Sequence, residues 1–292
     1  MEIKKIAVVG AGIMGNGIAQ VCAQAKYDVT MTDIQQKFVD NGLENINKSL
    51  ARMVKSGKVN EGEAAEIFKR IKGTISLKDA VKDADVIIEA VYEDLDVKKK
   101  VFKEIEEYCQ PTAILASNTS GLMITEIASD LKRPENFVGM HWFMPPAMMK
   151  CIEMIKGTLT SDETSKAIYD LSIKLGKEPL YANDVPGFFT TRYINSYLLE
   201  AVRLFEANVV GIKEMDTMCK TAFGWPMGPI ELMDAVGFDT VIHVAAYLYK
   251  ETGDPKFVAP MTLKKLVKAG YTGKKPGSKG GFYDYYKISR DK

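Results

Sequence analysis

The sequence has few of the residues that build metal centres or disulfide frameworks. It contains only four cysteines and two histidines in 292 residues. The cysteines are scattered without a Cys-x-x-Cys pair, which is typical of free thiols in a reducing compartment. The histidines, His141 and His243, lie far apart, and no thiolate pair accompanies either of them. We therefore expect free cysteines and no metal site.

The sequence also lacks an excess of one charge and any long hydrophobic run. A formal net charge of +1 gives no electrostatic reason to expect a nucleic-acid partner. No apolar run is long enough to span a bilayer, and no basic segment followed by an apolar stretch indicates a secretion signal. We expect a cytoplasmic protein that binds no membrane. A hydrophobic content of 46% is enough for a sizeable core, in one large domain or two modest ones.

A glycine-rich turn lies near the start of the chain. The apolar, β-branched run at 3–9 predicts a buried strand, and a helical pattern begins at Ile13. Between them, the G-x-G-x-x-G spacing is typical of a dinucleotide site: Gly10 permits the turn, Gly12 lets a pyrophosphate approach the backbone, and Gly15 lets helix and strand pack closely. By itself the motif also fits an ordinary turn. The cofactor contacts expected here are Gly10, Ala11, Gly12, Ile13, Met14 and Gly15.

An acidic residue stands where such a site needs one. A second predicted strand, at 28–32, ends on Asp33, about twenty residues after the glycines, where an acid meets the ribose hydroxyls. The alternative is a strand-end acid that faces water. Because a carboxylate repels a 2′-phosphate, the sequence favours NAD over NADP.

The order of the predicted elements gives the fold class. The polar region at 36–71 is too long for an ordinary crossover, so we interpret it as a helix pair inserted into the nucleotide fold. The remaining pattern predicts an α/β fold: a Rossmann-type parallel sheet with a helical-hairpin insert, followed by an all-helical C-terminal domain. We place the domains at 1–184 and 185–292. The predicted strands after the insert are 73–77, 84–91, 113–117, 137–143, 150–156 and 178–181.

Polar residues follow two of these strands. Ligands of open parallel sheets lie beyond the carboxyl ends of the strands. This rule places Glu93 and Lys98 near the cofactor, together with the run at 117–120, which ends in Ser120. The alternative for that run is an N-cap of the next helix, and the two roles are compatible.

Each of the next two predicted strands carries one ionisable residue. His141 lies near the end of the strand at 137–143, and Glu153 is embedded in the strand at 150–156. A buried glutamate needs a partner, and a tight return between the strands would bring it to the histidine. The carboxylate would then fix the imidazole tautomer of a general base. The alternative is a structural histidine and a solvent-facing glutamate.

One face of the inserted helix pair is basic. Lys48, Arg52 and Lys55 fall at helical spacing and therefore share a face. They could bind a ligand phosphate, although a solvated charged face is the commoner explanation of such a pattern. The glycine-rich tail at 271–283 offers lysines to which the same two explanations apply.

Six stretches together resemble the short-chain L-3-hydroxyacyl-CoA dehydrogenases, including bacterial 3-hydroxybutyryl-CoA dehydrogenases. The resemblance covers essentially the whole chain and implies a helical domain that forms a homodimer. It implies that His141 is the catalytic acid/base paired with Glu153, that Ser120 contacts substrate and cofactor, that Glu93, Lys98 and Lys275 contact the cofactor, and that Ser49 contacts coenzyme A. The stretches are GAGIMGNGIAQ, ASNTSGLMITEIA, GMHWFMPPAMMKCIEMI, DVPGFFTTR, FGWPMGPIELMDAVGFD and KKPGSKGGFYDY.

Three positions depart from the family pattern. Met144 and Thr191 each replace an asparagine, and Ser56 replaces a lysine that helps to hold coenzyme A. Met144 cannot donate a hydrogen bond to the cofactor, whereas Thr191 keeps a hydroxyl that could assist catalysis.

The resemblance favours reversible, NAD-dependent oxidation of an L-3-hydroxyacyl-CoA to the 3-ketoacyl-CoA. The departures leave two alternatives: a dehydrogenase of another hydroxy substrate, such as a hydroxy acid or a cyclic or branched acyl-CoA, or a non-catalytic NAD-binding relative.

Overall fold

The computed structural model describes residues 2–289, which form two compact units. One unit ends at Phe188 and the other begins at Phe189, close to the boundary at Asp184 that the sequence indicates. Each unit has its own hydrophobic core.

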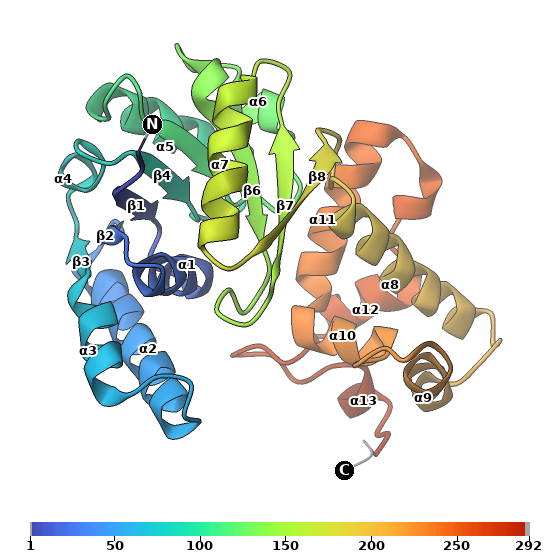
Figure 1. Cartoon of the computed structure of the whole chain (residues 1–292). Helices are drawn as coiled ribbons and strands as arrows, with labels where there is room; N and C mark the ends of the chain where they lie inside the picture. Colours follow the sequence, from blue (N-terminus) through green and yellow to red (C-terminus); the bar gives the residue numbers. More distant parts are fainter. Residues whose placement is uncertain (1, 290–292) are drawn as a thin grey trace. The chain divides into compact units, whose positions relative to one another are not determined.

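An eight-stranded sheet forms the first unit, with the strand order β3-β2-β1-β4-β5-β6-β7-β8 (Figure 1). All neighbouring strands are parallel except β6 and β7, which pair antiparallel. The Rossmann-type expectation is therefore confirmed, with a reversal of direction at the last two strands. The strands are β1 (Lys5–Val9), β2 (Asp28–Thr32), β3 (Ile71–Thr74), β4 (Val86–Glu89), β5 (Ile114–Ser117), β6 (Phe137–Trp142), β7 (Cys151–Lys156) and β8 (Glu178–Asn183).

Helices cover both faces of the sheet. Apolar residues of α1 and α7, such as Ile18 and Ile168, share one core with one face of the sheet. On the other face, Phe102 of α5 packs edge-on against Phe137, with ring centroids 4.6 Å apart. Helix α6 lies on that face too, because a Cβ on Gly139 would come within 2.7 Å of Ile124. The helices of this unit are α1 (Ile13–Gln24), α2 (Gln36–Lys55), α3 (Glu61–Lys69), α4 (Leu77–Val81), α5 (Leu95–Tyr108), α6 (Ile124–Ala128) and α7 (Asp162–Lys174), with a 3₁₀ turn at Pro134–Asn136.

The inserted helix pair is formed by α2 and α3, which follow one another between β2 and β3 (Figure 1). Asn60 begins α3 with a capping box, in which its side chain accepts from the Glu63 N–H and the Glu63 side chain accepts from the Asn60 N–H.

The strand predicted at 73–77 was misplaced. The observed strand, β3, begins at Ile71, two residues earlier. Leu77 instead begins helix α4, because the Ser76 hydroxyl accepts a hydrogen bond from the Asp79 N–H and caps that helix.

The second unit is helical, as the sequence predicts. Its core surrounds Phe238 and Phe282, which are both fully buried. Within residues 2–289, no helix has the length and apolar character needed to cross a membrane. The helices are α8 (Thr190–Glu206), α9 (Ile212–Phe223), α10 (Pro229–Val236), α11 (Phe238–Thr252), α12 (Met261–Lys268) and α13 (Phe282–Tyr285), with a 3₁₀ turn at Pro255–Phe257.

Candidate active site

The glycine turn between β1 and α1 has the geometry that a dinucleotide requires. Gly10 adopts φ +105°, and a Cβ there would lie 2.5 Å from the Ala90 carbonyl oxygen. A Cβ on Gly15 would lie 1.8 Å from the carbonyl oxygen of Gly10, so the helix packs on the turn itself. A Cβ on Gly12, in contrast, would meet nothing within 4 Å. Gly12 therefore leaves open space beside the start of α1.

Asp33 ties the end of β2 to this turn. Its Oδ2 accepts from the Ala11 N–H at 2.7 Å, and its Oδ1 accepts from the Ile34 N–H at 2.7 Å. No side chain caps the N-terminus of α1, whose cap residue is Gly12. Uncapped N–H groups attract phosphate, and an acid at the end of the second strand accepts from ribose hydroxyls. The residues present therefore fit a dinucleotide.

The strand order predicts where each half of a bound cofactor would lie along the sheet. The chain leaves β1 toward β2 and leaves β4 toward β5, so the topological switch lies between β1 and β4. Dinucleotides bind across the crevice at such a switch point. If Asp33 meets the adenosine ribose, as the sequence predicts, we expect the nicotinamide half over the carboxyl ends of β4, β5 and β6.

A buried ionic cluster lies at that end of the sheet. Lys98 Nζ lies 2.6 Å from Glu89 Oε1 and 3.2 Å from Glu93 Oε2, and the Lys98 side chain is only 1% exposed. Burial opposes the charge of Lys98, but the two carboxylates prevail and raise its pKa. Lys98 was expected beside the cofactor. The structure places its ammonium between Glu89 and Glu93, and its contact with the cofactor stays a prediction.

The polar turn after β5 rests on this cluster. Ser117 Oγ donates to Glu89 Oε2 at 2.6 Å and accepts from the Thr119 N–H at 3.2 Å. Glu93 Oε1 accepts from the Thr119 hydroxyl at 2.6 Å and from the Ser120 N–H at 2.8 Å. The Ser120 backbone is thus fixed while its residue stays exposed.

The structure brings His141 and Glu153 together. They are paired residues on the antiparallel strands β6 and β7, with 3.0 Å between Nδ1 and Oε2. Both are buried, and the ring of Phe143 lies 4.5 Å from the imidazole. The adjacent Trp142 N–H donates to Asn118 Oδ1 at 2.9 Å, which ties β6 to the turn after β5. His243, by contrast, is exposed on α11.

The loop between β6 and β7 carries Met144, whose side chain is 62% exposed. Lys177, just before β8, holds this loop, because its Nζ donates to the carbonyl oxygens of Pro146 at 2.6 Å and Met149 at 2.8 Å. The ammonium also lies 5.4 Å from the centre of the Trp142 ring. Burial lowers the pKa of Lys177. The sequence analysis missed this residue.

The sequence analysis also gave Glu89 no role, although it carries the same signal as Glu153. Each is a carboxylate in a run of apolar strand residues, although the strand predicted at 84–91 also contains Asp85. Nothing in the pattern around Lys177 distinguishes it from a surface lysine.

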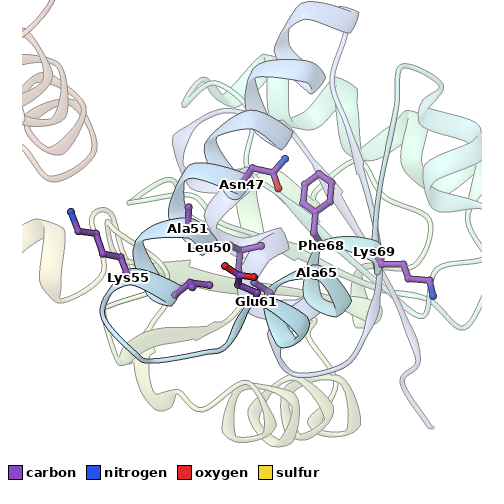
Figure 2. Close-up of a pocket in the computed structure, with 10 residues that line it drawn as sticks. Asn47, Leu50, Ala51, Lys55, Glu61, Ala65, Phe68 and Lys69 are labelled. Atoms are coloured by element: carbon purple, nitrogen blue, oxygen red, sulfur yellow. The ribbon is translucent and has the colours of Figure 1, made fainter.

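The inserted helix pair lines an open pocket of about 670 Å³ (Figure 2). Apolar side chains such as Leu50 and Phe68 lie between Lys55 and Lys69 in that view. Of the four residues expected to contact coenzyme A, only Lys55 lines the pocket; Lys48, Ser49 and Arg52 do not. Lys48 makes an ion pair with Glu44 at 2.6 Å, and both side chains are exposed.

Two expected site residues belong to the second unit. Thr191 lies in the first turn of α8 and is half-buried. Lys275 Nζ donates to Asp239 Oδ1 at 2.6 Å and to Thr240 Oγ1 at 2.8 Å. Their contacts with ligand remain predictions.

Two family models match the chain. One, the NAD binding domain of 3-hydroxyacyl-CoA dehydrogenase, matches residues 5–185. The other, the C-terminal domain of 3-hydroxyacyl-CoA dehydrogenase, matches residues 187–285. This chain belongs to the 3-hydroxyacyl-CoA dehydrogenase family. As a member, it is an NAD-dependent oxidoreductase, and the prediction of NAD is confirmed.

Several relatives align with almost the whole length of this chain. A 3-hydroxybutyryl-CoA dehydrogenase of Clostridioides difficile is 41% identical over 97% of this chain and 100% of its own. The crystal structure of (S)-3-hydroxybutyryl-CoA dehydrogenase from Ralstonia eutropha superposes with a TM-score of 0.90 at 38% identity, covering 95% of this chain and 98% of that one. A 5-formyl-3-hydroxy-2-methylpyridine 4-carboxylic acid 5-dehydrogenase has a TM-score of 0.75 at 30% identity, covering 96% and 90%.

Proposed function

We propose that the protein reversibly oxidises an L-3-hydroxyacyl-CoA to the 3-ketoacyl-CoA, with 3-hydroxybutyryl-CoA as the first substrate to test. The observation that carries the proposal is the His141–Glu153 pair, which lies on the nicotinamide side of the switch point. The near-full-length similarity to 3-hydroxybutyryl-CoA dehydrogenases supports the choice of substrate.

His141 is the general base of this reaction. An ionised Glu153 accepts from Nδ1–H and so leaves Nε2 free to take the proton of the substrate hydroxyl. Glu153 then stabilises the imidazolium that results. When bound, NAD supplies the hydride acceptor for the carbon that carries the hydroxyl.

Ser120 orients the substrate oxygen. Its backbone is fixed by Glu93, so its exposed side chain can be held at one position above the carboxyl end of β5. By the family resemblance, Thr191 assists in this role from α8, and Met144 and Lys275 contact the cofactor.

The inserted helix pair binds the coenzyme A part of the substrate. Lys55 and Arg52 lie in the last turn of α2 and are exposed, so both can meet a phosphate. Ser49 and Lys48 lie one turn earlier on the same helix. The apolar floor of the neighbouring pocket, which includes Leu50 and Phe68, suits a flat apolar or heteroaromatic group.

The test is an NADH absorbance assay with acetoacetyl-CoA, longer 3-ketoacyl-CoA thioesters and free acetoacetate. We expect turnover of the thioesters and a loss of at least about 10²-fold in kcat/KM for the free acid, because binding energy from the remote part of a substrate supports catalysis. Equal or faster turnover of the free acid would refute the proposal. Cofactor binding without turnover of any thioester would indicate a non-catalytic relative.

A second candidate is a dehydrogenase of another hydroxy substrate. Met144 and Thr191 stand where the family pattern has asparagine, so polar contacts near the reacting centre differ. The similar fold of a dehydrogenase that acts on a pyridine carboxylic acid shows that this architecture accommodates other substrates. Turnover of free hydroxy acids in the same assay would favour this candidate.

The helical unit presents an apolar surface suited to a homodimer. On α9, Met218 is 58% exposed and Phe223 is 70% exposed. A homodimer interface, which the family resemblance implies for this unit, would cover such side chains. Light scattering coupled to size-exclusion chromatography should give twice the monomer mass of 32.4 kDa. A monomer at micromolar concentration would contradict this part of the proposal.

We infer a cytoplasmic location, which the thiols support. All four cysteines are free, as the sequence predicts. A reducing compartment preserves such thiols. Fractionation of the host cells tests this location, and recovery of the protein from a secreted fraction would refute it.

A further inference from the structure

A buried charged triad lies beneath the nicotinamide half of the proposed cofactor site. It consists of Glu89, Lys98 and Glu93, with one ammonium between two carboxylates. Glu89 is fully buried at the end of β4. Three donors point at its carboxylate: Lys98 Nζ at 2.6 Å, the Ser117 hydroxyl at 2.6 Å and the Val91 N–H at 2.7 Å. An ionised carboxylate only accepts hydrogen bonds, so three donors suit it.

The triad carries one surplus negative charge. Among residues 2–289, the ion pairs of Glu89 and of Glu93 are with Lys98 alone. One positive charge therefore balances two negative ones. Since the cluster is mostly buried, water and salt screen this surplus less than they would screen a surface charge.

In the expected cofactor position, the surplus charge would face the part of the cofactor whose charge changes in the reaction. Glu93 accepts from the Thr119 hydroxyl and the Ser120 N–H, so its carboxylate lies at the turn above the carboxyl ends of β4 and β5. The nicotinamide ring carries a positive charge in NAD⁺ and none in NADH. A fixed negative charge beside it stabilises the oxidised form only.

We propose that Glu89 sets the relative affinity of the enzyme for NAD⁺ and NADH, because it supplies the carboxylate that leaves the Glu89–Lys98–Glu93 triad with a net negative charge. The inference depends on the placement of the nicotinamide half over β4 and β5 and does not depend on the identity of the acyl substrate. Without Glu89, Lys98 and Glu93 form a neutral pair. NAD⁺ would then lose an attraction that NADH never had.

The quantity to measure is the dissociation constant of NAD⁺ divided by that of NADH. Fluorescence titration gives the constant for NADH, and displacement of bound NADH by NAD⁺ gives the constant for NAD⁺, both at low salt. In Glu89→Gln we expect this ratio to rise on the order of tenfold, the factor for one unit charge about 10 Å away at an effective dielectric constant near 20. Glu93→Gln, at a half-exposed position, should move the ratio in the same direction. It serves as the second test if Glu89→Gln does not fold.

A double variant separates charge from geometry. Glu89→Gln combined with Lys98→Met removes one negative and one positive charge, so the triad again carries −1. The ratio should return toward the wild-type value, although the ion pair between positions 89 and 98 stays lost. A purely structural role of Glu89 predicts that the double variant is no better than the single one.

Glu106→Gln is the matched control. Glu106 is a nearly buried carboxylate on the same helix as Lys98, where it accepts from the Lys132 and Arg133 N–H groups at 2.9 and 2.8 Å. Its removal should lower thermal stability without changing the ratio. An unchanged ratio in folded Glu89→Gln would overturn the inference. Because the titration needs no acyl substrate, that result differs from a failure of the proposed dehydrogenase reaction.

Discussion

His141 and Glu153 occupy paired positions on two antiparallel strands, and Nδ1 of the imidazole lies 3.0 Å from Oε2 of the carboxylate. The register of a sheet is strongly specified, because a slip of one residue in either strand would turn the side chains of that strand to the opposite face and separate the pair. The pair is therefore held by the backbone of β6 and β7, and the loop between them can vary without separating it.

Replacement of His141 tests its role as the base. We expect His141→Gln to lower kcat by roughly 10² to 10⁴, the usual contribution of general base catalysis, with little change in the dissociation constant of NADH. The matched control is His243→Gln, since His243 is exposed on α11. Near-normal turnover by His141→Gln would show that another group removes the proton.

Replacement of Glu153 tests the tautomer. A glutamine can present its NH₂ group to Nδ1, which favours the wrong protonation of the ring and places the proton on Nε2. We expect Glu153→Gln to lower kcat by up to about 10⁴, as loss of the orienting acid does in other acid–histidine pairs. Steady-state kinetics at saturating NAD measures this effect. A change in KM alone would contradict it.

The glycine turn offers two substitutions with different expected results. A Cβ on Gly15 collides with the Gly10 carbonyl, so Gly15→Ala should lower the free energy of unfolding by about 1 to 3 kcal/mol and weaken NAD binding. A Cβ on Gly12 meets no protein atom within 4 Å, so Gly12→Ala should keep the Tm of the wild type.

Gly12→Ala should nevertheless bind the cofactor more weakly than the wild type, because the added methyl group occupies the space that we assign to the pyrophosphate. Thermal melts with and without NADH compare the variants. An unchanged NADH-induced rise in Tm for Gly12→Ala would show that the phosphates bind elsewhere.

Lys177 holds the loop that follows the catalytic strand. Lys177→Met removes the donor to the carbonyl oxygens of Pro146 and Met149, of which the bond to Pro146 is buried, and leaving one buried acceptor unsatisfied costs about 1 to 3 kcal/mol. Since the loop carries Met144, we also expect a higher KM for NAD. Lys174→Met, at an exposed position of α7, is the control. Equal KM values in the two variants would show that the loop does not contact the cofactor.

The parts of the site that the sequence predicts are those fixed by local pattern. The glycine spacing and Asp33 follow from one strand–helix–strand unit, β1–α1–β2. The His141–Glu153 pair follows from two adjacent apolar strands that each hold one ionisable residue. Lys177 could not be predicted in this way, because its partners are backbone carbonyl groups about thirty residues away, which have no signature in the sequence. The bounds of β3 were predicted wrongly because the Ser76 hydroxyl caps helix α4, so residues with a strand-like pattern begin a helix instead.

The alkaline stability of the second unit depends on Tyr283, whose hydroxyl donates to buried Asp216 Oδ2 at 2.7 Å. Burial, together with the negative charge of Asp216, raises the pKa of Tyr283 above its ordinary value of 10.0. The folded state therefore keeps the phenol proton at a pH where the unfolded chain loses it. The stabilisation is complete below about pH 10 and is lost as the pH rises beyond that value.

Tyr283→Phe should accordingly cost about 1 kcal/mol at neutral pH, for one hydrogen bond, and should reduce the steepness with which Tm falls above pH 10. Melts of wild type and variant between pH 8 and pH 11 measure both effects. Tyr285→Phe, at an exposed position of the same helix, is the control. If Tyr283→Phe and the wild type lost Tm in parallel over this range, the alkaline transition would belong to another group.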